Sequence, residues 1–171
     1  MASAEAPSHA DLQSAAQRLA DALHGRGWML ATAESCTGGL VGHAITQVPG
    51  SSGHYLGGLV TYSDSAKREL LGVSADLLDR VGAVSSEVAL AMAHGALERF
   101  PTAHLAVSVT GVAGPDGGSV DKPVGLTYVG TAMRDGSTAV ERHVWPHDRD
   151  GNKRASALAC LALATRFASE A

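Results

Sequence analysis

Ala33-Glu34-Ser35-Cys36-Thr37-Gly38-Gly39 is the stretch around which this 171-residue chain is organised. The apolar run before it, residues 28–32, predicts a buried strand, and the run after it, residues 40–45, predicts the start of a helix. The stretch is therefore a turn between a strand and a helix. Such a turn offers free N–H groups and the positive end of a helix dipole, which favour an anion or a developing oxyanion. Glu34 is interpreted either as a residue that orients the turn or as an ordinary surface charge.

The small side chains of this turn include two candidate nucleophiles. We interpret Ser35 as the nucleophile. Cys36 is its rival, because a helix N-terminus lowers the pKa of a thiol, although it can equally be a small buried side chain. Thr37 is better suited to capping the helix than to attacking a substrate. Gly38 and Gly39 are expected to leave the N–H groups of the turn open to a substrate.

The rest of the chain alternates helices with strands. Patterning predicts helices over residues 12–23, 40–45, 65–71, 86–100 and 148–167, and strands over residues 28–32, 56–62, 104–109, 124–133 and 138–145. Arg134-Asp135-Gly136-Ser137 is typical of a hairpin between the last two strands. Residues 1–9 are small and polar and are expected to fray. We therefore predict one α/β domain over residues 1–171, a three-layer α-β-α sandwich with a mixed, mostly parallel sheet.

The composition excludes several classes of partner. Aromatic residues make up 4% of the chain, the net charge is −4 and there is no basic run, so we expect no nucleic-acid partner. No apolar stretch approaches the length of a membrane span, and no signal peptide is visible, so we expect no membrane partner. The two cysteines, Cys36 and Cys160, do not form a disulfide framework. These features together predict a cytoplasmic protein.

A serine nucleophile needs a base to take its proton. There is no Gly-x-Ser-x-Gly elbow, and the eight histidines are interpreted as ordinary surface or hydrogen-bonded residues, although a Ser-His-Asp arrangement stays open. Lysine is more informative, because a desolvated lysine can act as a base and an arginine cannot. Lys67 follows Tyr62 by five residues across a strand-to-helix junction, so the amine and the phenol can reach one rim. The competing interpretations are a solvated lysine and an aromatic residue at the edge of the core.

A second glycine-rich loop covers residues 110–119 and can hold a phosphate or a carboxylate with its N–H groups. It matches neither the Walker loop nor the dinucleotide-binding fingerprint. His143 and His147 are four residues apart, but Pro146 lies between them, and no Cys/His pair has zinc spacing. We therefore expect neither a metal site nor a cofactor.

Three motifs occur in a fixed order along the chain. They are Thr32 to Gly39; Val60-Thr61-Tyr62-Ser63 with Lys67 and Leu70-Leu71-Gly72-Val73; and Thr110-Gly111-Val112-Ala113-Gly114-Pro115 followed by Lys122-Pro123-Val124-Gly125. Together they resemble the CinA C-terminal domain family, whose stand-alone members are nicotinamide-nucleotide amidases. The resemblance covers nearly the whole chain, from about Leu12 to Phe167.

The resemblance implies a metal-independent serine amidohydrolase of NAD salvage that converts nicotinamide mononucleotide to nicotinate mononucleotide and ammonia. Carried over to this chain, it makes Ser35 the nucleophile, Lys67 the base and Tyr62 its partner. The turn after the first strand would hold the oxyanion, and the second loop would hold the phosphate. The expected substrate-binding residues are Cys36, Thr37, Gly38, Gly39, Thr110, Gly111, Gly114 and Arg149. A homo-oligomer, specifically a dimer, is also expected.

Two residues depart from the family pattern. The family often has Asn where this chain has Asp64, and a carboxylate near Lys67 would favour the charged amine over the free base. It often has Gly where this chain has His147, which would crowd or extend the pocket. Two alternatives therefore stay open: a catalytically inactive domain that binds or senses pyridine nucleotides, and an amidase with a different substrate or with Cys36 as its nucleophile.

Overall fold

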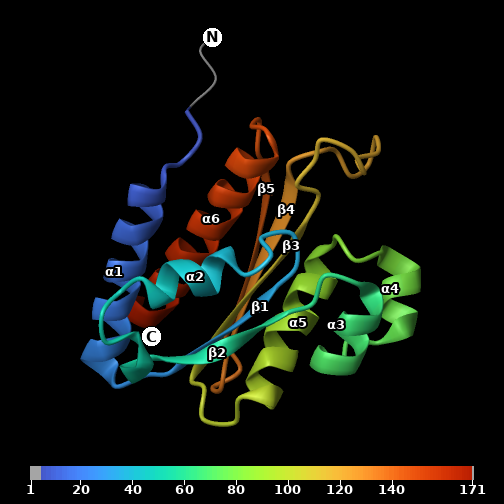
Figure 1. Cartoon of the computed structure of the whole chain (residues 1–171). Helices are drawn as coiled ribbons and strands as arrows, with labels where there is room; N and C mark the ends of the chain where they lie inside the picture. The colour runs from blue at the N-terminus through green and yellow to red at the C-terminus, as the bar shows by residue number, and fades with distance from the viewer. Residues whose placement is uncertain (1–4, 171) are drawn as a thin grey trace.

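The computed structural model describes residues 5–170, which form a five-stranded sheet covered by α-helices (Figure 1). The strands are β1 (Leu30–Glu34), β2 (Tyr55–Val60), β3 (Leu105–Gly111), β4 (Leu126–Met133) and β5 (Thr138–Val144). The helices are α1 (His9–Arg26), α2 (Leu40–Thr46), α3 (Asp64–Leu71), α4 (Ala75–Val81), α5 (Ser86–Arg99) and α6 (Arg149–Glu170), with a short 3₁₀ helix, η1 (Ser51–Gly53).

The sheet has the strand order β2-β1-β3-β4-β5. β1 pairs in parallel with both β2 and β3, whereas β4 is antiparallel to β3 and to β5, so four of the five strands run in one direction. The predicted mixed sheet is confirmed. Glu34, the last residue of β1, is in register with Val60 of β2 and Val109 of β3. The segments that follow these three strands therefore meet at the carboxyl end of the strands, where open α/β sheets bind their ligands.

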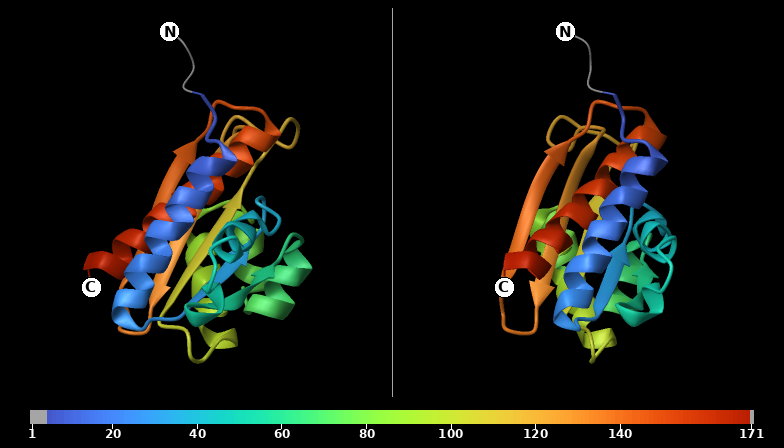
Figure 2. Two further views of the ribbon diagram at one scale, coloured as in Figure 1. Left: turned by 60° about the vertical axis from the view of Figure 1, so that its left-hand side comes forward. Right: turned by 90° about the vertical axis from the view of Figure 1, so that its left-hand side faces the viewer.

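Helices cover both faces of the sheet, which confirms the predicted three-layer sandwich. α1, α2 and α6 pack on one face, with α1 and α6 side by side, and α3, α4 and α5 pack on the other (Figures 1 and 2). Side chains alternate along β1, so Leu30 belongs to the first core and Ala31 and Ala33 to the second. The face toward α5 carries small residues. A Cβ at Gly130 would lie 2.8 Å from the Ala89 carbonyl oxygen, so α5 packs closely on the sheet.

The first strand and the turn after it begin later than predicted. β1 begins at Leu30 rather than at residue 28, and it continues through Glu34 because both neighbouring strands pair with it that far. Ala33 and Glu34 therefore belong to the strand, and the turn begins at Ser35.

The helices also differ from the prediction at two places. α4 was not predicted; it is short, buries only Leu78, and is capped by the Ser74 hydroxyl. α1 begins at His9, because Ser8 and Asp11 form a capping box. Of the nine residues expected to fray, residues 1–4 lie outside the described part, whereas Ser8 caps α1 and His9 is its first residue. Within residues 5–170, none of the helices combines the length and the apolar composition needed to cross a membrane.

The His54 side chain, just before β2, is buried without hydrogen bonds to its ring nitrogens. It is 2% exposed, and neither ring nitrogen has a hydrogen-bond partner among the described residues. Burial lowers the pKa of His54, and the nearby His24, whose ring centroid lies 6.3 Å away, lowers it further. An unsatisfied buried polar group typically costs about 1–3 kcal/mol. The fold therefore carries a histidine that resists protonation.

Acidification is expected to destabilise the protein through His54. Because the pKa of His54 is lower in the folded chain than in the unfolded chain (about 6.5), the unfolded chain binds the proton more readily. The contribution of neutral His54 to the free energy of unfolding is complete above pH ~6.5, and it is lost as the pH falls through the lowered pKa of His54. In thermal unfolding between about pH 5 and pH 8, the melting temperature of His54→Phe should fall less on acidification than that of the wild type. The exposed His94→Phe should keep the wild-type slope; parallel curves for His54→Phe would contradict the prediction.

Candidate active site

A cleft of about 250 Å³ opens where β1, β2 and β3 end. Its walls come from the turn after β1, the β2–α3 junction, the loop after β3 and the start of α6. The register of the three parallel strands brings the segments that follow them together at the carboxyl end of the sheet. Eight predicted site residues line it: Ser35, Cys36, Tyr62, Lys67, Thr110, Gly111, Gly114 and Arg149. The other three predicted site residues, Thr37, Gly38 and Gly39, do not.

Ser35 and Lys67 form the central pair of the cleft. Lys67 comes from the first turns of α3, is only 1% exposed, and places Nζ 3.1 Å from Ser35 Oγ. Nζ also donates to the carbonyl oxygens of Thr61, at 2.9 Å, and Tyr62, at 3.4 Å. A neutral amine has two hydrogens and one lone pair. The two carbonyl groups can accept both hydrogens, which leaves the lone pair for the Ser35 hydroxyl.

Burial also favours the neutral form of this amine. Desolvation lowers the pKa of Lys67, whereas Asp64 and Cys36 act weakly in the opposite direction. Asp64 is exposed in the first turn of the same helix, and no ion pair joins it to Lys67 in the described part of the chain. Asp64 therefore raises the pKa of Lys67, as expected, but burial lowers this pKa by more.

The Tyr62 side chain lines the cleft, and its hydroxyl is hydrogen-bonded to Arg149. The residue is 62% exposed, and its hydroxyl accepts a hydrogen bond of 3.3 Å from Arg149 Nη2. Its backbone carbonyl is the group that contacts Lys67. Within residues 5–170, no hydrogen bond links the Tyr62 hydroxyl to Ser35 or Lys67. The role of Tyr62 as partner of the base therefore stays a prediction.

Glu34 is the main site residue whose place was left open by the sequence. It is 2% exposed and points into the start of α2 rather than into solvent. Its Oε2 accepts from Thr37 Oγ1 at 2.7 Å and from the N–H groups of Gly39 at 3.0 Å and Val41 at 3.1 Å. Its Oε1 accepts from the N–H of Gly42 at 2.8 Å. The Thr37 hydroxyl is therefore held inside the protein and is not free for a substrate.

Of the N–H groups of the turn that were expected to be open to a substrate, those of Gly38 and Gly39 themselves are engaged. Gly38 donates to the Ser35 carbonyl at 3.0 Å, and Gly39 donates to the buried carboxylate described above. Both glycines adopt a positive φ, 63° and 100°, which the tight turn requires. Among the described residues, the N–H groups of Cys36 and Thr37 have no acceptor. These two amides are the ones available to a substrate oxygen.

The opposite wall of the cleft is fixed by polar contacts of the second loop. Thr110 Oγ1 donates to the Ala83 carbonyl at 2.8 Å, so its hydroxyl is already engaged. Arg149, the first residue of α6, donates through Nη1 to the Gly114 carbonyl at 2.6 Å and through Nη2 to Tyr62. Its exposed guanidinium thus spans the mouth of the cleft, where it can meet an anionic group.

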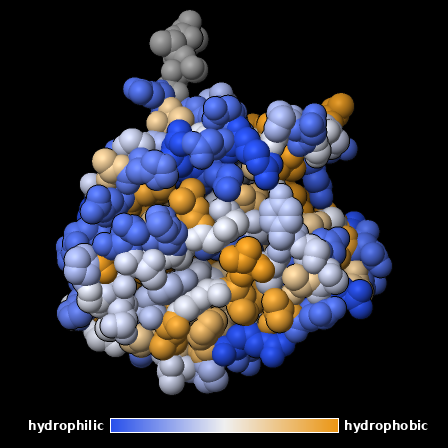
Figure 3. Space-filling model, viewed as in Figure 1, coloured by the Kyte–Doolittle hydropathy of each residue, from blue (hydrophilic) through white to orange (hydrophobic). Residues whose placement is uncertain are grey.

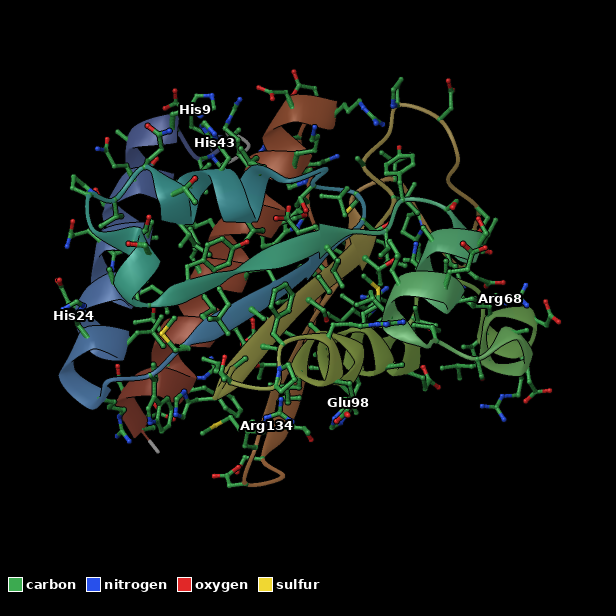
Figure 4. All side chains as sticks on the ribbon, turned by 60° about the horizontal axis from the view of Figure 1, so that its bottom comes forward. His9, His24, His43, Arg68, Glu98 and Arg134 are labelled. Atoms are coloured by element: carbon green, nitrogen blue, oxygen red, sulfur yellow. The ribbon has the colours of Figure 1, made fainter. Side chains whose placement is uncertain are left out.

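No histidine of the described residues lines the cleft. His9, His24 and His43 lie on the side of the molecule formed by α1 and α2 (Figure 4). His147 donates its backbone N–H to Asn152 Oδ1 at 3.1 Å and does not line the cleft. The expectation that His147 would crowd or extend the pocket therefore does not hold. Nor do residues 5–170 place three or more His, Cys, Asp or Glu side chains where they could hold a metal ion.

Comparison with known proteins identifies the family of this fold and site. A family model described as the CinA C-terminal domain matches residues 12–168. The chain belongs to the CinA C-terminal domain family.

Individual members of the family differ in length and in name. The chain is 47% identical over 145 residues to nicotinamide-nucleotide amidohydrolase PncC of Enterobacter agglomerans, which covers 85% of this chain and 88% of that protein. It is 52% identical over 124 residues to a CinA-like protein of Akkermansia muciniphila, which covers 72% of this chain but only 30% of that protein. The crystal structure of competence/damage inducible protein CihA from Agrobacterium tumefaciens superposes with a TM-score of 0.86 at 41% identity, covering 94% of this chain and 96% of that one.

In this CinA-type domain, the thiol of Cys36 is poorly suited to attack. Burial raises the pKa of Cys36 to about 12, and the side chain packs in the core with α1, α2 and α6. A thiol with such a pKa is almost fully protonated at neutral pH, and the thiolate is the reactive form. The geometry therefore favours Ser35 over Cys36 as the nucleophile.

Thiol labelling checks this assignment. The chain has two cysteines, Cys36 and Cys160, and both are buried. Because burial raises the pKa of each thiol, the native protein should react with a chromogenic disulfide reagent at least about tenfold more slowly than the denatured protein. The denatured protein should yield both thiols. Rapid labelling of one thiol in the native protein, together with a folded but inactive Cys36→Ala, would contradict the assignment.

Proposed function

We propose that this CinA-type domain is a nicotinamide-nucleotide amidase, which hydrolyses the carboxamide of nicotinamide mononucleotide to nicotinate mononucleotide and ammonia. The observation that carries this proposal is the 3.1 Å approach of the buried Lys67 Nζ to Ser35 Oγ inside the cleft. The similarity to a protein named nicotinamide-nucleotide amidohydrolase supports the choice of substrate.

The proposed reaction uses only groups of the cleft. Neutral Lys67 takes the proton of Ser35 as Oγ attacks the carboxamide carbon. The N–H groups of Cys36 and Thr37 stabilise the oxyanion, and one such donor is typically worth about 3 kcal/mol. The proton then passes from Lys67, with Tyr62 as its proposed partner, to the leaving ammonia. Water hydrolyses the acyl-enzyme by the same proton route in reverse, which releases the carboxylate and regenerates the serine. No step requires a metal ion.

Ammonia release from nicotinamide mononucleotide tests the proposal. The wild type should release ammonia in the presence of a chelator, and Ser35→Ala should reduce the rate by about 10⁴-fold or more while its melting temperature stays unchanged. A fully active Ser35→Ala would exclude this nucleophile. Tight nucleotide binding without turnover by the wild type would instead indicate a binding or sensing domain, and turnover of other carboxamides alone would indicate a different substrate.

Variants of Lys67 separate a base from a simple positive charge. Lys67→Arg should be as damaging as Lys67→Ala, because an arginine keeps the charge but cannot release its proton. In the wild type, the rate should rise with pH as Lys67 loses its proton. Because burial lowers the pKa of Lys67, the midpoint should lie below the ordinary value of 10.5. A Lys67→Arg variant with half of the wild-type rate would argue that Lys67 acts only electrostatically.

We propose that Arg149, with the loop that holds Gly114, binds the phosphate of the substrate. A charged hydrogen bond of this kind is typically worth about 1.5–3 kcal/mol, so Arg149→Ala should lower kcat/KM for the mononucleotide by roughly 10- to 100-fold, mainly through KM. The matched control is nicotinamide riboside, which lacks the phosphate and should be turned over equally by the variant and the wild type. Equal losses on both substrates would show that Arg149 supports the cleft instead of reading the phosphate.

We further propose that the protein forms a homodimer. β2 is an edge strand, and a group of hydrophobic residues lies over this part of the face shown in Figure 3. Val60 at the end of β2 is one of the exposed large hydrophobic residues. An exposed strand edge next to apolar side chains favours association with a second copy. Light scattering of the purified protein measures the mass, and a monomer at micromolar concentration would contradict this proposal.

A further inference from the structure

The buried carboxylate of Glu34 lies one residue before the nucleophile, and the mechanism above does not use it. It accepts four hydrogen bonds, one from the Thr37 hydroxyl and three from the N–H groups of Gly39, Val41 and Gly42. A carboxylate buried to this degree is stable only when its lone pairs are matched by donors. Here the donors all belong to the segment that follows Ser35. The carboxylate therefore closes the strand, the turn and the helix into one hydrogen-bonded ring.

The backbone on either side of this ring is also fixed. Glu34 itself pairs with β2 and β3, and the N–H of Ser35 donates to the Val109 carbonyl at 3.0 Å. At the far side, a Cβ on Gly42 would lie 2.8 Å from the Tyr55 hydroxyl oxygen and 3.5 Å from Glu34 Oε1. The glycine therefore allows the helix to approach the carboxylate closely. The backbone of Ser35 is therefore held between two anchored segments, which fixes where the residue lies relative to Lys67.

The carboxylate also decides which amides remain for the substrate. A free helix N-terminus attracts any anion, including the phosphate of a nucleotide. At α2 this position is filled by the protein's own charge, and the unengaged N–H groups of the turn, within the described residues, are those of Cys36 and Thr37. A substrate oxygen near Ser35 is thereby directed to these two donors.

We propose that Glu34 is a positioning residue for the nucleophile turn: its carboxylate occupies the start of α2, holds Ser35 Oγ against Lys67 Nζ, and leaves the Cys36 and Thr37 amides for the oxyanion. This inference rests on the proposed serine mechanism but not on the identity of the substrate. The competing explanation is that Glu34 only stabilises the fold.

The decisive variant is Glu34→Gln, which keeps the shape of the side chain. Its NH₂ group must replace one oxygen and then faces an N–H donor, so either the bond from Gly42 or those from Gly39 and Val41 are lost and a repulsive contact is added. We expect kcat for ammonia release to fall by about tenfold or more, with KM changed by less than about threefold. Glu87→Gln is the matched control, because Glu87 also lies in the first turn of a helix but is exposed, and it should behave as the wild type.

A second readout does not depend on the natural substrate. A fluorophosphonate reacts with an activated serine: Ser35 Oγ forms a bond to phosphorus, fluoride leaves, and Lys67 takes the proton. Mass spectrometry measures the rate. We expect labelling of Glu34→Gln to slow in proportion to kcat, while the midpoint of the pH–rate profile stays that of the wild type, because Glu34 is not among the groups that shift the pKa of Lys67.

Each outcome decides between the two roles. A folded Glu34→Gln that is labelled at the wild-type rate, even with a lower melting temperature, would overturn the inference and leave Glu34 a structural residue. A shifted pH midpoint would overturn it in favour of direct electrostatic tuning of Lys67. If the wild type is labelled but releases no ammonia from the mononucleotide, the proposed substrate fails while the labelling comparison still tests Glu34. A wild type that is neither labelled nor active would overturn both.

Discussion

Burial of the Lys67 amine next to Ser35 is the interaction on which the site depends. A lysine in this place needs acceptors for its hydrogens, and the two residues that follow β2 supply them as the carbonyl groups of Thr61 and Tyr62. Helical side chains lean toward the helix N-terminus, so a lysine in the first turns of α3 reaches back to that strand end. Ser63 caps the helix at the point where the chain turns. Lys67 is therefore positioned by local rules of strand and helix geometry rather than by a separate structural element.

The site contains two buried charged groups that the protein treats in opposite ways. Glu34 is surrounded by four donors, which satisfy the carboxylate. Lys67 is surrounded by two carbonyl groups and a hydroxyl, and no carboxylate of residues 5–170 forms an ion pair with it, so its charged form is penalised by burial. An ion pair between the two would have kept the lysine protonated and useless as a base. The turn keeps the two groups apart, so burial can lower the pKa of Lys67 without an ion pair to Glu34 that would raise it.

The pattern of the sequence predicted the sheet, most helices and the pair Ser35 and Lys67, because apolar periodicity and the scarcity of lysine are visible in the sequence. α4 was missed because a seven-residue helix that buries one side chain has almost no periodic signal. Which amides of the turn stay open could not be predicted, because glycine signals freedom of the backbone but not which acceptor each N–H will find. The signal for Glu34 was an acidic residue at the junction of a buried strand and a helix, a place where it can cap the helix. The Tyr62 side chain could not be placed, because its orientation depends on Arg149, which lies 87 residues away along the chain.

The order of the strands in space also governs when this site can form during synthesis. Ser35 and Lys67 lie only 32 residues apart, so both leave the ribosome early. However, β1 lies between β2 and β3 in the sheet, and residues 105–111 must be made before β1 has both of its neighbours. The same late segment continues into the loop that forms the opposite wall of the cleft. The wall that restricts access to Ser35 is therefore made together with the strand that completes the pairing of β1.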